Sequence, residues 1–304
     1  MDAGAMEQLR KDGYEVIEQF YEPDQLGAAL RDFDVVIIRS ATKIKEPQID
    51  AAAGSRLKLI IRAGVGVDNI AVKYAEEHGI QVKNTPRASS NAVAELGVAM
   101  ILNCLRSIPQ LNQKLDQGEW ARAVGKEILG KTVGILGFGD IGGRVAKKLS
   151  GMGVELLAYD PYPNEAKARD LHVTLTDMDT VLAKSDVISI HMPSIPATRH
   201  IMDRAAFAKM KQGAYFINTA RGALVDTQAL IDAVTGGHLA GAALDVYEQE
   251  PLPMDAPILH TPGIQCTPHT GAETVETYHN ISMMAAQAVI DSLNGKEPKN
   301  WINR

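Results

Sequence analysis

The sequence predicts an α/β protein made of two doubly wound parallel-sheet domains. Short apolar runs rich in β-branched residues alternate with helical patterns along most of the chain. A glycine-rich turn joins one such run to a helix within residues 131–160, and 304 residues suit about two domains. We expect residues 1–88 and 273–304 to form a substrate-binding domain, and residues 89–272 a dinucleotide-binding domain.

The first third of the chain alternates between the two kinds of segment. The patterns predict helices at 5–11, 23–30 and 69–78, and strands at 14–17, 35–38, 57–62 and 80–83. No strand precedes Ala5, although an α/β unit usually opens with one. Either the first strand of this domain is missing, or its start is misassigned.

The remaining elements continue the alternation. A long amphipathic helix over 90–107, followed by another at 111–120, is expected to join the domains. Further helices are predicted at 178–184, 204–209, 227–236 and 274–294, and strands at 187–191, 214–218, 239–245 and 264–266. The last helix is expected to return to the first domain.

Residues 131–160 read as strand, glycine turn, helix, strand and acidic residue. After an apolar run at 132–136, Gly137, Gly139 and Gly142 have G-x-G-x-x-G spacing. The first glycine permits a tight turn, the second lets the backbone approach a pyrophosphate, and the third lets the helix lie close to the strand. The N-terminus of this helix directs free N–H groups at phosphates. The segment therefore predicts dinucleotide binding.

Asp160 follows the second strand, at 154–159, and indicates which dinucleotide binds. A carboxylate there accepts hydrogen bonds from the adenosine ribose hydroxyls and repels a 2′-phosphate. Residues 161–163 read Pro-Tyr-Pro and offer no cation for that phosphate. We expect NAD rather than NADP, although Asp-Pro can also simply open a turn.

Composition excludes several functions. The net charge is −6 and no basic run occurs, which argues against nucleic-acid binding. No apolar stretch is long enough to span a membrane, and residues 1–16 lack signal-peptide features. Cys104 and Cys266, the only cysteines, form neither a metal-ligand cluster nor a disulfide framework and are expected in the core. A cytosolic protein without a metal is expected.

Three candidate catalytic side chains follow predicted strands in the second half of the chain. Arg221 lies in NTARGALVD, Glu250 in DVYEQEP and His269 in TPHTGA. In a doubly wound sheet, ligands bind outside the carboxyl ends of the strands. A histidine can exchange a proton with a hydroxyl or carbonyl oxygen, a carboxylate can orient it, and an arginine can clamp a substrate carboxylate. Taken singly, each residue is more often structural: a surface or packing histidine, a solvated turn glutamate, or a helix-capping or ion-paired arginine.

The ordered motifs resemble the D-isomer-specific 2-hydroxyacid dehydrogenases. They are RAGVGVDNI (62–70), NTP with VAE (84–86, 93–95), GILGFGDIGGRVA, NTARGALVD, AGAALDVYEQEP and TPHTGAET. The resemblance implies an NAD-dependent enzyme with flavodoxin-like and Rossmann-like domains, an active site between them and a homodimer formed through residues 90–120. It assigns substrate binding to Arg221, support of the histidine to Glu250, and acid/base catalysis to His269.

Two sets of binding residues follow from this reading. Besides Gly137, Gly139, Gly142 and Asp160, we expect cofactor contacts from Asp140, Ile141, Met192, Pro193, Ala220, Asp245 and Gly271. Substrate contacts are expected from the backbone of Gly64, Val65 and Gly66 and from the side chains of Arg39 and Arg62.

Within the family, IIRSATKIK (37–45) is most similar to the members that act on 3-phosphoglycerate. There, arginines matching Arg39 and Arg62 supply positive charge to a phosphorylated substrate, which would place the reaction in serine biosynthesis. Arg39 could instead merely pair with Asp34. The chain ends shortly after the last helix, like the short form without a regulatory domain. The alternatives are a reductase of glyoxylate, hydroxypyruvate or another 2-oxo acid, and an NAD-sensing binding protein.

Overall fold

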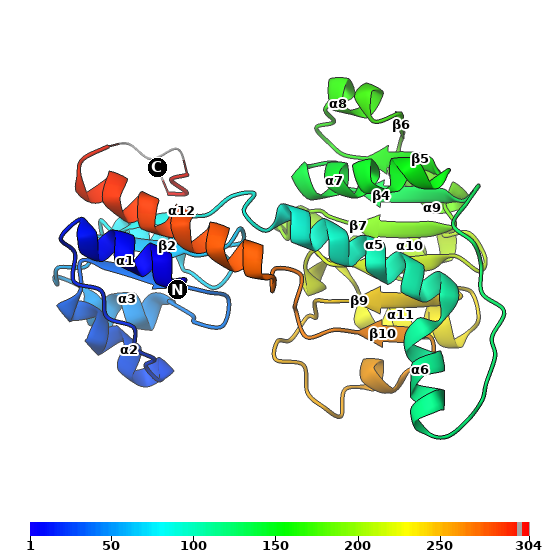
Figure 1. The fold of residues 1–304 in the computed structure, drawn as a ribbon, viewed down its shortest axis with the longest axis horizontal. Coiled ribbons are helices and arrows are strands. Elements are labelled where there is room, and N and C mark those ends of the chain that lie inside the picture. Colours follow the sequence, from blue (N-terminus) through cyan, green and yellow to red (C-terminus); the bar gives the residue numbers. More distant parts are fainter. Residues whose placement is uncertain (297–299, 304) are drawn as a thin grey trace. The chain divides into compact units, whose positions relative to one another are not determined.

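The computed structural model describes residues 1–296 and 300–303. Its residues divide into two compact units (Figure 1), one comprising Met1–Ser89 with Ala272–Arg304 and the other Ser90–Gly271. These limits lie one residue from the boundaries expected from the sequence. Both units are α/β with parallel sheets, as predicted.

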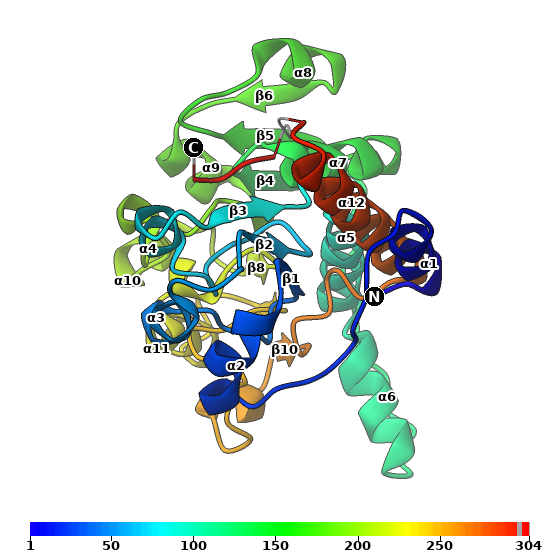
Figure 2. The ribbon, with the colours of Figure 1, turned by 90° about the vertical axis from the view of Figure 1, so that its left-hand side faces the viewer.

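The first unit contains a three-stranded parallel sheet. Its order is β1-β2-β3, formed by Val35–Ile38, Leu59–Arg62 and Gln81–Asn84. Alternate side chains of β2 enter different cores, as the strand period of two requires. Leu59 and Ile61 pack with α1 (Ala3–Lys11) and α12 (Val275–Leu293), whereas Ile60 packs with α2 (Pro23–Ala29) and α3 (Glu46–Ala52). Figure 2 shows the two helix layers on opposite sides of this sheet.

The strand predicted at 14–17 is wrong. Residues 14–21 belong to no helix or strand and pair with no strand of the sheet. They line a cavity of about 710 Å³ whose other wall includes the whole of β1. The segment therefore has no ladder partner, and β1 is an edge of the sheet among the residues described.

Two other differences arise from local polar chemistry and short elements. The helix predicted at 69–78 is shorter, α4 being Val72–Glu77, because the Asn69 side chain donates to the carbonyls of Arg39 and Thr42 and belongs to a loop. The sequence prediction also missed α3, α8 (Glu165–Asp170) and β6 (Val173–Leu175). These elements have seven, six and three residues, which is too short to give a clear periodic pattern.

The second unit contains a seven-stranded parallel sheet of order β10-β9-β8-β7-β4-β5-β6 (Figure 1). Two of its strands, Val187–Ile190 and Gly241–Leu244, are buried at every residue, as expected of a parallel sheet covered on both faces. The order reverses between β4 and β7, so this is the switch point at which ligands bind in such sheets. The other strands are β4 (Thr132–Leu136), β5 (Glu155–Tyr159), β7 (Val187–Ile190), β8 (Tyr215–Asn218), β9 (Gly241–Leu244) and β10 (Ile264–Cys266).

Helices cover both faces of this sheet. One core includes α5 and α7, and the other includes α9, α10 and α11. Cys104 lies in the first core, where burial raises the pKa of its thiol to about 12, and Cys266 packs against the second. These helices are α5 (Ser90–Arg106), α7 (Asp140–Leu149), α9 (Met178–Lys184), α10 (Arg204–Lys209) and α11 (Thr227–Thr235).

Helix α5 is followed by α6 (Ile108–Asp116) after a sharp change of direction at Ser107, whose φ is 53°. Within the described part of the chain, no single helix is long and apolar enough to cross a membrane; α5 and α6 taken together would meet those criteria, with a bend of 65°.

Candidate active site

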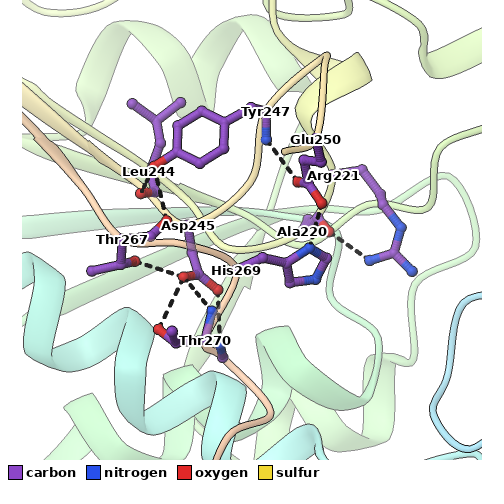
Figure 3. Close-up of polar contacts among 10 residues, drawn as sticks. Ala220, Arg221, Leu244, Asp245, Tyr247, Glu250, Thr267, His269 and Thr270 are labelled. Carbon is purple, nitrogen blue, oxygen red and sulfur yellow. Dashed lines mark hydrogen bonds and ion pairs between the residues drawn. The ribbon is translucent and has the colours of Figure 1, made fainter. Parts of the chain in front are cut away.

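The three predicted catalytic side chains lie at the same edge of the seven-stranded sheet. Arg221 follows β8, Glu250 follows β9 and His269 follows β10, and these strands are neighbours. Because the strands are parallel, their carboxyl ends bring the three side chains together (Figure 3).

His269 and Glu250 form a hydrogen-bonded pair. The imidazole Nδ1 lies 2.7 Å from Glu250 Oε2, and Glu250 Oε1 accepts a 3.0 Å hydrogen bond from the Tyr247 backbone N–H. Burial alone would raise the pKa of Glu250. The hydrogen bonds from His269 and Tyr247, with the charges of His269 and Arg221, outweigh it, so the pKa lies below its ordinary value. An ionised Glu250 therefore orients the ring and stabilises its protonated form.

The other imidazole nitrogen is available for chemistry. Among the described residues nothing forms a hydrogen bond with His269 Nε2, and the side chain is 36% exposed. The residue also has a φ of 53°, a left-handed conformation that costs a non-glycine residue about 1 kcal/mol or more. The fold thus holds His269 in a backbone conformation that the residue would disfavour in an unfolded chain.

Asp245 anchors the backbone beside His269. Its carboxylate, 1% exposed, accepts hydrogen bonds from the N–H groups of Thr270 and Gly271, each 2.8 Å long, and from the Thr267 hydroxyl at 2.6 Å. The sequence predicted Asp245 and Gly271 as cofactor contacts. The structure shows them joined to each other in holding the histidine loop.

Arg221 projects from a turn fixed by Asn218. The Asn218 side chain accepts from Ala220 N–H and donates to the Arg221 carbonyl, both at 2.9 Å. Arg221 Nη1 donates to the Ala220 carbonyl at 2.7 Å (Figure 3). Gly222 lies so close to Tyr247 that a Cβ would fall 1.8 Å from its carbonyl carbon, so the turn packs directly on the loop that carries Glu250.

The glycine-rich turn after β4 has the geometry that a dinucleotide needs. Gly137 has a φ of +93°, which side chains rarely adopt. A Cβ on Gly142 would lie 2.2 Å from the Gly137 carbonyl oxygen, whereas one on Gly139 would meet nothing within 4 Å. The open side at Gly139 leaves room for a pyrophosphate near the N-terminus of α7, so the residues present fit NAD.

Asp160 lies beside this turn, after β5. Its two carboxylate oxygens accept 2.8 Å hydrogen bonds from the N–H groups of Phe138 and Tyr162. Each oxygen retains acceptor capacity for ribose hydroxyls. Of the other predicted contacts, Asp140 and Ile141 open α7, where Asp140 pairs with Arg144 at 3.1 Å; Met192 and Pro193 follow β7, and Ala220 follows β8.

Replacing Asp160 by alanine is expected to narrow the preference for NAD over NADP at least about tenfold, because the charge that repels the 2′-phosphate is removed. The measurement is kcat/KM with each cofactor. Asp160→Asn removes the charge but keeps an acceptor for one N–H, and Asp170→Ala is the control. An unchanged preference in both Asp160 variants would exclude this role.

The predicted substrate residues of the first unit follow adjacent strands. Arg39 comes directly after β1, and Arg62 ends β2 in register with Ile38. Arg39 forms an ion pair with Glu273 and stacks over Tyr278, with 5.3 Å between its Cζ and the ring centroid. Asp34, the partner considered from the sequence, pairs with Arg56 instead.

The loop after β2 has the form of an anion-binding backbone. Gly64 lies under the Arg62 side chain, where a Cβ would overlap Nη1 at 1.3 Å. The Gly64 and Val65 carbonyls accept from Thr85 N–H at 2.9 Å and from the Asn84 side chain at 2.7 Å. No hydrogen bond engages the N–H groups of Val65 and Gly66 within the described residues, so they can serve a carboxylate.

Comparisons with known proteins identify the family. Residues 98–271 match the D-isomer specific 2-hydroxyacid dehydrogenase NAD binding domain. The chain belongs to the D-isomer-specific 2-hydroxyacid dehydrogenases. It is therefore an NAD-dependent oxidoreductase, as the sequence predicted.

Individual relatives differ in their substrates. The chain is 41% identical to a hydroxypyruvate reductase of Thermotoga maritima over 94% of this chain and 93% of the relative. It is 38% identical to a D-3-phosphoglycerate dehydrogenase of Archaeoglobus fulgidus over 98% of this chain but only 57% of that longer protein. Among solved structures, D-lactate dehydrogenase of Aquifex aeolicus complexed with NAD and lactic acid has a TM-score of 0.86 at 27% identity, covering 100% of this chain and 96% of that chain.

The sequence reasoning missed a second imidazole–carboxylate pair close to the first. Glu248 Oε1 lies 2.6 Å from His200 Nε2, and its Oε2 accepts from the Thr227 hydroxyl at 2.6 Å. These contacts tie the Glu250 loop to two other segments. The signal was the extra acid in DVYEQEP, which spacing alone could not distinguish from a solvated side chain.

Proposed function

We propose that the chain interconverts hydroxypyruvate and D-glycerate, with 3-phosphohydroxypyruvate and 3-phosphoglycerate as the second candidate pair. One observation supports this reaction above all, the 2.7 Å contact between His269 Nδ1 and Glu250 Oε2. It leaves Nε2 of the imidazole to donate and accept the proton.

His269, Glu250 and Arg221 have separate roles in the reduction of a 2-oxo acid. When bound, NADH supplies the hydride to the carbonyl carbon, and NAD accepts it in the reverse direction. Protonated His269 donates its Nε2 proton to the carbonyl oxygen, and Glu250 stabilises the imidazolium until then. Arg221 binds the substrate carboxylate through two parallel hydrogen bonds and so orients the carbonyl.

The ion pair of Arg39 favours hydroxypyruvate, the unphosphorylated substrate. Its guanidinium is already balanced by the Glu273 carboxylate, which a phosphate dianion would have to displace and whose charge would repel it. The near-complete overlap with a hydroxypyruvate reductase supports the same assignment.

The phosphorylated pair is favoured by a different feature. Arg39 directly follows β1, Arg62 ends the neighbouring strand β2, and together they would provide two positive charges. Several relatives are 3-phosphoglycerate dehydrogenases. This assignment would place the enzyme in serine biosynthesis.

The choice of substrate is tested by the kinetics of NADH oxidation with phosphohydroxypyruvate, hydroxypyruvate, glyoxylate, pyruvate and 2-oxoisocaproate. Hydroxypyruvate is expected to have the highest kcat/KM. A higher kcat/KM for another of these acids would reject hydroxypyruvate as the substrate.

Glu273→Gln is expected to raise the ratio of kcat/KM for phosphohydroxypyruvate over hydroxypyruvate about tenfold, equivalent to about 1.4 kcal/mol. The physical reason is that Arg39 loses its competing carboxylate. Adding Arg39→Ala should cancel the gain, and Glu276→Gln is the control. If Glu273→Gln leaves the ratio unchanged, the ion pair does not select the substrate.

We also propose a homodimer formed through α6 and the loop that follows it. Ile108, Leu115, Trp120, Val124 and Leu129 are large apolar side chains exposed in this segment, and Trp120 is 83% exposed. Such a surface is costly to leave in water, and a second copy of the same segment would cover it.

Trp120→Glu is expected to convert the dimer to monomer, because it places a charge in an apolar interface. Mass measurement by light scattering during size-exclusion chromatography gives the result directly. Tyr162→Glu, at a similarly exposed aromatic residue elsewhere, should leave the mass unchanged. A monomeric wild type would refute the proposal.

A further inference from the structure

Lys167 connects helix α8 to the glycine-rich turn. Its ammonium donates to the carbonyls of Phe138 at 2.6 Å and Gly139 at 2.7 Å. The same nitrogen lies 4.4 Å from the centroid of the Phe138 ring. It also lies against Gly143, where a Cβ would be 3.0 Å away. One side chain thus reaches the first turn of α7 and the two residues between Gly137 and Asp140.

This placement is unusual for a lysine, which ordinarily keeps its ammonium in water. Burial lowers the pKa of Lys167, and the charges of Asp140 and Asp160 act in the opposite direction. Two charge-assisted hydrogen bonds and the face of an aromatic ring compensate for the lost hydration. Both hydrogen bonds and the ring contact are with the turn that the dinucleotide must approach.

The orientation of two peptide groups explains what Lys167 can do. In a phosphate-binding turn, backbone N–H groups face the anion, so the carbonyls of the same segment face away from it. Phe138 and Gly139 supply two such carbonyls, and Lys167 binds both. The side chain therefore fixes these two peptides through their carbonyls, while a Cβ on Gly139 would meet nothing within 4 Å.

We propose that Lys167 is a positioning residue for NAD, which holds the glycine-rich turn in the conformation whose N–H groups receive the pyrophosphate. A preorganised turn loses less freedom on binding, so affinity rises without a direct contact. The positive charge beside the turn adds attraction for a dianionic pyrophosphate.

The test compares Lys167→Met, which keeps the length of the stem but loses the donors, with Lys167→Arg, which keeps charge and donors. The Kd of NADH, measured by fluorescence titration, is expected to rise about tenfold or more in Lys167→Met and to return to within about threefold of wild type in Lys167→Arg. At saturating NADH, kcat should stay within about twofold, because the acid/base residues are untouched. Lys184→Met, at an exposed residue of α9, is the matched control.

A second measurement separates positioning from general structural support. Binding of ADP-ribose, which carries the pyrophosphate, should weaken as much as binding of NADH, whereas binding of adenosine, which lacks it, should not. Wild-type affinity of Lys167→Met for NADH, or equal losses for adenosine and ADP-ribose, would overturn the proposal. If Lys167→Met does not fold, Lys167→Gln is measured against the same two outcomes.

Discussion

Replacing His269 by asparagine is expected to lower kcat about 10³- to 10⁴-fold while the Kd of NADH stays within about twofold. Asparagine tolerates the left-handed backbone at this position, so the loop held by Asp245 should survive. The loss then reports the missing proton transfer. Steady-state kinetics and NADH fluorescence titration give the two quantities.

His172 provides a matched control for this substitution. It is exposed, has the same φ of 53°, and lies before β6, at the opposite end of a strand from the catalytic edge. His172→Asn should retain wild-type kcat. Retention of kcat in His269→Asn would remove the imidazole from the mechanism, and a parallel loss in both variants would show that the backbone conformation, not the chemistry, was affected.

Replacing Arg221 by methionine is expected to lower kcat/KM for the 2-oxo acid about 10²- to 10⁴-fold, corresponding to loss of a charged, bidentate substrate contact. Methionine preserves much of the side-chain volume. Asn218, rather than the guanidinium, fixes the turn, so the fold should persist. The measurement is kcat/KM with saturating NADH.

Two further variants define the role of Arg221. Arg221→Lys should recover only part of the activity, because an ammonium cannot form the two parallel hydrogen bonds. Arg204→Met, which breaks an exposed ion pair with Asp232 on another helix, should have no effect on kcat/KM. Full activity in Arg221→Lys would show that charge alone suffices.

Regular periodicity made most of the fold predictable. Strands 35–38, 132–136 and 264–266 and helices 178–184 and 204–209 begin and end where the sequence indicated, because each is an apolar or amphipathic run bounded by turn residues. The strand at 14–17 failed for a non-local reason. Strand identity requires a hydrogen-bonded neighbour, and no periodicity reveals that the neighbouring position is a cavity.

The sequence could predict those residues of the site that follow a strand. Arg221, Glu250 and His269 come together because parallel strands end at one edge. The contacts of Asp245, Glu248 and Lys167 were not predictable, since each joins residues about 20 or more positions apart through side-chain geometry. Likewise, the sequence offered Asp34 as the partner of Arg39, but only packing could select Glu273.

The most direct test of the catalytic assignment is an assay of NADH oxidation with hydroxypyruvate, run beside NADH binding on the same protein. We expect continuous turnover to D-glycerate by the wild type, and its loss with unchanged NADH binding in His269→Asn. Tight NADH binding by the wild type without oxidation by any of the five 2-oxo acids would contradict this account and favour an NAD-sensing protein.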